Sequence, residues 1–292
     1  MIPDLSCDIR GFALYSTYGQ SFFTNCTFDR NNINSTSVTT SDIMGCEFQI
    51  SNGDTIIDNC IFSNINININ SNTGTTRILG GTLHFYNSNV NLTYCSFENN
   101  IINSIENDRF SFIGLIRSES DSNATFCNCN FLDNYCNTQS CNRYYSYSLI
   151  IHSTCYMMMN NCNLNNNTIN SKNNDNSELR SVLISQSTSK DIILNQCIMK
   201  NNRLNETSDT ICEIQSGFIS LIDTKGNISM VFFENNHISY IDVTNNLIVT
   251  SGMFYFKNAN LIISSLEVNS DISSFNVNYN EAISFYIELS YI

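Results

Sequence analysis

The sequence predicts an all-β fold, a right-handed parallel β-helix (solenoid) of about eight coils of ~34 residues with three short strands per coil. Three observations lead to this prediction. A unit anchored by a cysteine recurs along the chain, apolar residues alternate by two within each unit, and asparagine recurs at a fixed place between the apolar runs. Neighbouring coils of such a fold lie about 4.8 Å apart, so residues one repeat apart should form columns.

The anchor of the repeat is a cysteine, and successive anchors are 33 to 35 residues apart. The anchor position is filled by Cys26, Cys60, Cys95, Cys129, Cys162 and Cys197, and further along the chain by Val231 and Ser264. The second residue after each anchor is large and apolar: Phe28, Phe62, Phe97, Phe131, Leu164, Met199, Phe233 and Leu266. Because side chains alternate between the two faces of a strand, both positions are expected to point into the interior.

Asparagine follows three residues after the large apolar position. It stands there as Asn31, Asn100, Asn134, Asn167, Asn202 and Asn236. Asparagine tolerates the left-handed backbone conformation and bonds its own main chain, so these residues are predicted to form tight turns. Two residues later an apolar side chain such as Ile33 or Ile102 begins a second short strand. A third strand is predicted in the apolar run before each anchor, as at 78–85 and 112–116.

Helical tetratricopeptide repeats have a similar period, but helix-forming residues are scarce here and the apolar alternation is that of strands. One elongated domain, 1–292, is therefore predicted. The apolar run at 281–292 ends before its next anchor, which suggests a fragment of a longer solenoid. Uncapped terminal coils are expected to allow end-to-end association.

The composition argues against several kinds of partner and location. The formal net charge is −13, with 13 Lys and Arg and no basic run, so no nucleic-acid partner is expected. The polarity comes instead from 49 asparagines. Residues 1–10 do not have the pattern of a secretion signal. A transmembrane segment needs about 18 or more apolar residues in a row, and the sequence has no such stretch.

The 13 cysteines allow two interpretations. The first is a ladder of buried free thiols, which pack as small apolar groups; stacked strand neighbours have poor geometry for disulfides. The second is a set of disulfides, as in secreted proteins, with Cys141 and Cys155 as the most plausible pair. Zinc bound by Cys127, Cys129, Cys136 and Cys141 is disfavoured because the spacing matches no strong zinc pattern. No metal and no cofactor is predicted.

No catalytic residue is predicted either. A glycoside hydrolase needs two carboxylates that face one cleft, whereas the acidic residues here are dispersed. Asp54 and Asp58 are the closest acidic pair on one coil. His84 and His152 are expected two coils apart, as ordinary residues of the strand before the anchor.

The repeated tetrapeptides resemble those of a known family. F-x-x-N spans 28–31, 97–100, 131–134 and 233–236, and a motif close to G-G-A-[ILV] spans 80–83, with looser forms that start at Gly45 and Gly114 in the same phase. These motifs are similar to those of chlamydial polymorphic outer-membrane proteins and of trichomonad-type protist surface proteins, in which cysteine also precedes the phenylalanine. The resemblance covers nearly the whole chain. It implies a parallel β-helix displayed at the cell surface for adhesion, and no catalytic residue.

These observations together predict a non-enzymatic, surface-exposed or secreted, adhesin-like scaffold that displays contacts for a protein or glycan ligand. Two polar segments, 137–147 and 170–180, are interpreted as long insertions on one side of the solenoid, either binding loops or tolerated surface loops. The alternative function is that of a carbohydrate-active enzyme, a polysaccharide lyase or glycoside hydrolase, because the same scaffold carries such enzymes. The expected location is the cell surface or the extracellular space.

Overall fold

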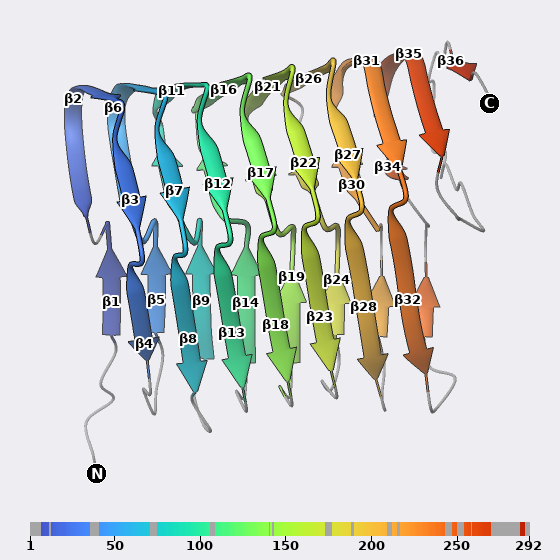
Figure 1. Ribbon diagram of the computed structural model, residues 1–292, viewed down its shortest axis with the longest axis horizontal. Helices are drawn as coiled ribbons and strands as arrows, with labels where there is room; N and C mark the ends of the chain where they lie inside the picture. Colours follow the sequence, from blue (N-terminus) through green and yellow to red (C-terminus); the bar gives the residue numbers. More distant parts are fainter. Residues whose placement is uncertain are drawn as a thin grey trace.

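The chain is an all-β parallel solenoid, as predicted. The structure, a computed structural model, describes residues 7–11, 13–35, 41–70, 75–105, 109–139, 141, 143–172, 177–187, 190–208, 212–214, 217–242, 247–249, 254–257, 259–269 and 287–289. Within these ranges every helix or strand assigned is a strand, and the strands form three sheets, named A, B and C below (Figure 1).

Sheets A and C each contribute one strand to a coil. Sheet A contains β1 (Cys7–Arg10), β5 (Ser41–Met44), β9 (Thr75–Leu79), β14 (Arg109–Ile113), β19 (Arg143–Ser146), β24 (Ser177–Leu179), β29 (Cys212–Ile214) and β33 (Leu247–Val249). Sheet C contains β4 (Asn32–Ser35), β8 (Asn66–Asn70), β13 (Ile101–Ile105), β18 (Tyr135–Gln139), β23 (Thr168–Lys172), β28 (Arg203–Ser208) and β32 (His237–Asp242).

Sheet B is larger and has three rows of strands. The first row contains β2 (Leu14–Thr24), β6 (Phe48–Asp58), β10 (Leu83–Tyr86), β15 (Ile116–Glu119), β20 (Ile151–Ser153), β25 (Ile184–Ser187), β30 (Ile219–Ile222) and β34 (Phe254–Lys257). The second contains the ends of β2 and β6, then β11 (Asn89–Thr93), β16 (Asn123–Cys127), β21 (Tyr156–Asn160), β26 (Asp191–Asn195), β31 (Lys225–Glu234) and β35 (Asn260–Asn269). The third contains β3 (Thr27–Asp29), β7 (Ile61–Ser63), β12 (Ser96–Glu98), β17 (Asn130–Leu132), β22 (Asn163–Asn165), β27 (Ile198–Lys200) and the ends of β31 and β35; β36 (Ile287–Leu289) pairs with β35.

The coil count and the strand count both differ from the prediction. The solenoid has about six turns rather than about eight. In sheet A the six strands from β5 to β29 have a described strand on both sides, whereas β1 and β33 lie at the ends. Between Thr75 and Ile105 one coil has five strands, β9 to β13, rather than three, because the backbone bends at Gly80, Asn87, Tyr94 and Asn99, which all have positive φ.

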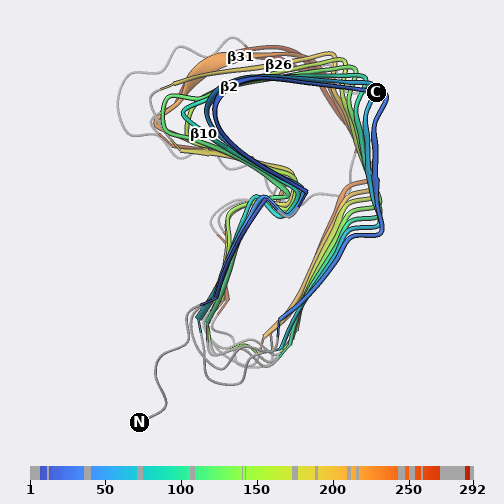
Figure 2. The same ribbon diagram turned by 90° about the vertical axis from the view of Figure 1, so that its left-hand side faces the viewer.

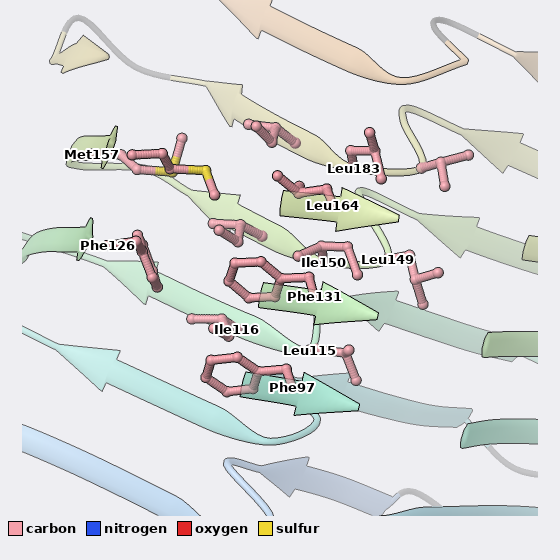
Figure 3. Close-up of a cluster of buried hydrophobic side chains, with 14 of the residues drawn as sticks. Phe97, Leu115, Ile116, Phe126, Phe131, Leu149, Ile150, Met157, Leu164 and Leu183 are labelled. Atoms are coloured by element: carbon pink, nitrogen blue, oxygen red, sulfur yellow. The ribbon is translucent and has the colours of Figure 1, made fainter. Parts of the chain in front are cut away.

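The predicted column of large apolar side chains is present in the interior. Phe97 lies in register between Phe62 and Phe131, and Figure 3 shows the column continuing to Leu164 on the next strand. The rings of Phe28, Phe62, Phe97 and Phe131 are stacked, with centroids 4.9 to 5.0 Å apart. Burial of each such side chain stabilises the fold by roughly 1.5–3 kcal/mol, which makes this column a main source of cohesion between coils.

The cysteine anchors also point inward, and the 11 cysteines from Cys26 to Cys197 are free thiols. Cys60, Cys95, Cys129, Cys162 and Cys197 are buried, and Cys26 in the first coil is half-buried. Contact with the Cys129 thiol, together with burial, raises the pKa of Cys162 to about 12, so this thiol stays protonated at neutral pH. The alternative interpretation, a Cys141–Cys155 disulfide, does not hold, because neither cysteine is in a disulfide. The Cys141 sulfur is 3.8 Å from the Ser104 hydroxyl, and the Cys155 thiol donates a hydrogen bond to the Ser120 carbonyl oxygen.

The asparagines that recur three residues after the large apolar position were predicted to form tight turns, and this prediction is wrong. The left-handed backbone belongs to the residue before each of them, as in Asn99 and Asp133, which have φ of 53° and 55°. Asn100, Asn134, Asn167, Asn202 and Asn236 themselves are buried inside the solenoid. Each of the first four donates from Nδ2 to the Oδ1 atom of the next, at 2.8 to 3.0 Å. The turn residue can lie outside, whereas the buried residue satisfies backbone groups of neighbouring coils.

Two further positions of the repeat need correction. Val231 is buried as predicted, but it pairs with Leu266, while Ser264 pairs with the half-exposed Ser229. Leu266 therefore fills the anchor position of the last coil, because an apolar side chain can be buried there without a hydrogen-bond partner. Val268 takes the large apolar position in register with Phe233.

The outline of the coil is concave on one side. The view along the rod in Figure 2 shows each coil turning inward between sheet A and the row that contains β10. The turn is made at Gly45, Gly80 and Gly114, which have φ of 53°, 67° and 72°. A Cβ atom on Gly80 would lie 2.1 Å from the Leu83 carbonyl oxygen, so this corner requires glycine. The corner brings the outer faces of sheet A and of the β10 row toward each other.

Candidate functional site

The two segments interpreted as long insertions are mostly strand. The 137–147 segment contains the end of β18 and all of β19, and the 170–180 segment contains the end of β23 and all of β24. Residues 140, 142 and 173–176 lie outside the described residues. The prediction of long insertions is therefore wrong: their polar side chains alternate with buried ones such as Tyr144 and Leu179.

Asp54 and Asp58 do not form an acid pair. Both lie on the outer face of β6, four residues apart, and therefore about 13 Å apart along the strand. Each is bonded to the next coil: Asn89 Nδ2 donates to Asp54 Oδ1 at 2.8 Å, and the Thr93 hydroxyl donates to Asp58 Oδ1 at 2.7 Å. Glycoside hydrolysis needs carboxyl groups about 5–9.5 Å apart on either side of one bond, and this pair does not meet that requirement.

The two histidines are two coils apart, as predicted, but Arg117 stands between them. Gln49, His84, Arg117, His152 and Ser185 form one column on the outer face of the first row of sheet B. His84 and His152 are only 3% and 4% exposed, because the concave corner covers this outer column. Sequence alternation alone would place these side chains in solvent.

Side chains of sheet A and its following bends meet this column and form a charged group, named the corner cluster: His84, Arg117, Glu119, Tyr147, His152, Glu178 and Arg180. His84 Nε2 lies 2.7 Å from Glu119 Oε1, and Arg117 forms an ion pair with the same carboxylate. Arg180 pairs with Glu178 at 3.3 Å and lies 4.3 Å above the ring of Tyr147. The Tyr147 ring centroid is 4.8 Å from that of His152, so the cluster spans several coils.

The surroundings in the corner cluster shift the pKa of two of its members, His152 and Glu119. Burial, together with the positive charges of Arg117 and Arg180, lowers the pKa of His152 to about 3, so its imidazole is neutral at pH 7. Burial alone would raise the pKa of Glu119, but the hydrogen bond with His84 and the charge of Arg117 outweigh it and lower that pKa. The cluster thus combines two ion pairs, Arg117–Glu119 and Arg180–Glu178, with the neutral imidazole of His152. This arrangement joins sheet A to sheet B.

A second group of side chains, on the opposite part of the coil from sheet A, remains open to solvent. It is named the aromatic–amide patch and consists of Tyr18, Gln20, Phe22, Asn52, Asp54, Asn87 and Asn89, from β2, β6, β11 and the bend before β11. Tyr18 and Phe22 are 76% and 66% exposed. Two adjoining depressions of about 490 and 290 Å³ share Gln20 and Asp54 in their walls. The patch therefore combines exposed rings with hydrogen-bonding groups in one recessed surface.

The amides of the patch are held in place by neighbouring coils. Asn87 Nδ2 donates to Asn52 Oδ1 at 2.7 Å, and Asn123 Nδ2 donates to Asn89 Oδ1 at 2.6 Å. Gly19 and Gly53 lie in register in the wall of the larger depression, and a Cβ atom on Gly53 would come within 2.5 Å of the Gly19 carbonyl oxygen. The equivalent residue of the third coil, Ser88, is buried and bonds the Tyr86 carbonyl oxygen at 2.8 Å.

Sequence analysis missed both groups of residues. Arg117 lies 12 residues before its anchor Cys129, and His84 and His152 lie 11 and 10 residues before their anchors. These similar spacings are a signal from which the column of His84, Arg117 and His152 could have been predicted. No periodic signal marks the aromatic–amide patch, because its column continues as Asn123 and Tyr156, which differ in chemistry.

The comparisons and the described residues give no direct indication of chemistry. No protein-family model, curated protein or solved structure matches the chain. Among the residues that the structure describes, no three His, Cys, Asp or Glu side chains are grouped so that they could hold a metal ion. The same part of the chain contains no helix long and apolar enough to cross a membrane.

Proposed function

We propose that this chain is a non-enzymatic interaction scaffold, an adhesin-like rod exposed at the cell surface or in the extracellular space. The observation that carries the proposal is the arrangement of outward side chains in straight columns on a rigid core. Asn34, Asn68 and Asn103, for example, form one outward amide ladder with hydrogen bonds of 2.9 Å between coils. Contacts repeated about every 4.8 Å along such a surface can add up to strong attachment although each is weak.

Two further features support this function. The interior is organised by stacked rings and asparagine amides, which suits a stiff support rather than a moving enzyme. The repeated F-x-x-N motifs resemble those of surface proteins with a role in adhesion. Asp54 and Asp58, the acidic pair considered for catalysis, have the spacing and partners of surface side chains held by the next coil.

The first test is where the protein is found and whether it attaches. A tagged gene product is detected with antibody on intact and on permeabilised cells of the source organism, and beads coated with purified full chain are incubated with intact cells. Surface labelling together with attachment of coated beads is expected. Labelling confined to permeabilised cells, or beads that attach no better than albumin-coated ones, would contradict the proposal.

The second test addresses the enzyme alternative. The purified chain is incubated with soluble plant and microbial polysaccharides, and new reducing ends and unsaturated uronates are measured. No product above the buffer control is expected. Turnover that persists in independently purified batches would replace the scaffold function by a carbohydrate-active one.

A further inference from the structure

We infer that the aromatic–amide patch is a binding site for a neutral, extended glycan chain. The inference rests on the proposed function, because it names the ligand class that the scaffold would hold.

The rings are placed as stacking platforms. Tyr18 lines one depression and Phe22 the other, with Gln20 and Asp54 common to both. Tyr18 lies at a bend of β2, with a φ of 63°, and Phe22 follows four residues later, so at most about 13 Å of chain separates them, which is within the length of a short oligosaccharide. The face of an aromatic ring carries a partial negative charge and attracts the polarised C–H groups of a sugar ring. Two exposed rings in adjoining depressions suit different sugar units of one chain.

The hydrogen-bonding groups between the rings are already positioned. Asn89 Nδ2 bonds only one oxygen of Asp54, Oδ1, which leaves the other oxygen of this exposed carboxylate for a ligand hydroxyl. Asn87 bonds Asn52 in the same way, and the hydrogen-bonding groups in both depressions include amides, which donate and accept as sugar hydroxyls do. Side chains that are ordered before binding lose less conformational entropy on binding, and this favours affinity.

The charge of the patch selects a neutral ligand. Asp54 is its one ionisable carboxylate, and no Lys or Arg lines either depression. The chain as a whole has a formal net charge of −13, so acidic polysaccharides and nucleic acids would be repelled. A protein partner would need a broader interface, about 800 Å² on each side, whereas this surface is two small adjoining depressions.

The position of the patch is specific to the first coils. The Gln20 column continues through Asp54, Asn89 and Asn123, and then changes to Tyr156 in the next coil. Further along, Asp191 lies in register with Lys225, so the column carries charged groups in the later coils instead of amides. Gly19 and Gly53, which line the larger depression, are followed in the third coil by the buried Ser88.

The test uses the full chain and isothermal titration calorimetry. The probes are the β-1,4-linked pentasaccharides of glucose and of N-acetylglucosamine, with the pentasaccharide of galacturonic acid as an acidic probe. At least one neutral probe is expected to bind, with the acidic probe at least about tenfold weaker. Phe22→Ala and Tyr18→Ala are each expected to weaken binding at least about tenfold, and Tyr18→Phe to keep most of it.

Ile262→Ala is the matched control. Ile262 lies in the same outward column as Phe22 at the other end of the rod and is 59% exposed, so its truncation is expected to leave binding unchanged. Circular dichroism of every variant checks that the fold is intact. Equal loss in Ile262→Ala and Phe22→Ala, or tighter binding of the acidic probe, would overturn the inference. If the unaltered chain attaches to cells but binds neither neutral probe, the glycan inference is overturned and the scaffold function remains. If the unaltered chain does not attach to cells, the scaffold function itself fails.

Discussion

Replacement of one buried asparagine, Asn134→Ala, is expected to break the amide ladder at its middle. Asn134 Nδ2 donates to the Phe97 carbonyl oxygen and to Asn167 Oδ1, both at 2.9 Å. Its Oδ1 accepts from the Asn100 backbone N–H at 3.2 Å and from Asn100 Nδ2 at 3.0 Å. The side chain is completely buried, so water cannot replace these partners. The substitution therefore removes four hydrogen bonds from three consecutive coils.

The expected loss follows from this set of contacts. Four hydrogen bonds at about 1 kcal/mol each predict a loss of about 4 kcal/mol in the free energy of unfolding. Domains are typically stable by roughly 5–15 kcal/mol, so this one change would remove a large share. Ile65 shows why the chain tolerates an apolar residue at the equivalent place in the second coil. Asn31 Nδ2, the amide that would otherwise donate to this position, donates instead to Glu47 Oε1 at 2.7 Å.

The assay compares Asn134→Ala with Asn103→Ala. Asn103 is the outward counterpart, a half-exposed amide with one ladder bond of 2.9 Å to Asn68, and its loss should cost less than about 1 kcal/mol. Urea unfolding followed by circular dichroism gives the global effect. Because solenoid coils can open separately, hydrogen exchange of the Asn100 amide gives the local one. The reasoning is refuted if the two variants unfold at the same urea concentration and the Asn100 amide keeps its protection.

Three further predictions concern acid, glycine and the thiols. His152 has a pKa of about 3 in the folded chain, below its unfolded value of 6.5, so the unfolded state takes up the proton first and stability falls as pH drops below 6.5. Between pH 7 and pH 4 the free energy of unfolding, measured with urea, should fall by about 3 kcal/mol. This fall should be smaller in His152→Gln and unchanged in the exposed control His237→Gln. Gly226→Ala would place Cβ 1.9 Å from the Ile192 carbonyl oxygen and should lower the melting temperature by several degrees, whereas Asn227→Ala, exposed beside it, should not. Because the described thiols are free, a reducing agent should not change the melting temperature, and a drop on its addition would show that the ladder contains disulfides.

The interior columns could be predicted because they are constrained twice, by alternation within a strand and by the repeat between coils. Cys95 and Phe97 satisfy both constraints, and the structure places them as expected. The different roles of Asn99 and Asn100 were harder to predict. Both tolerate a turn, and only the path of the backbone decides that Asn99 takes the left-handed conformation while Asn100 turns inward. Residue type alone could not separate the two roles.

The candidate site lay beyond what periodicity can predict. Arg117 has the alternation of an outward residue, yet the inward turn at Gly80 and Gly114 places a second wall against it and covers most of its side chain. Phe22 has the opposite character: an aromatic residue in an apolar run suggests burial, but its position in the strand points it outward. Both outcomes depend on the shape of the whole coil, which no single strand specifies.

The separation of inward and outward columns explains how a repetitive rod can carry one non-repetitive site. An inward residue such as Asn134 bonds the coils on both sides of it, so a change there disturbs both. The outward column of Gln20 and Asp54 keeps its register although it passes through amides, a carboxylate and a tyrosine, because outward side chains do not determine the strand pairing. Substitution at Phe22 or Asp54 should therefore alter ligand binding while the free energy of unfolding stays within about 0.5 kcal/mol. A parallel loss of stability in Phe22→Ala would mean that the patch is part of the structural support of the first coil and not a surface free to bind.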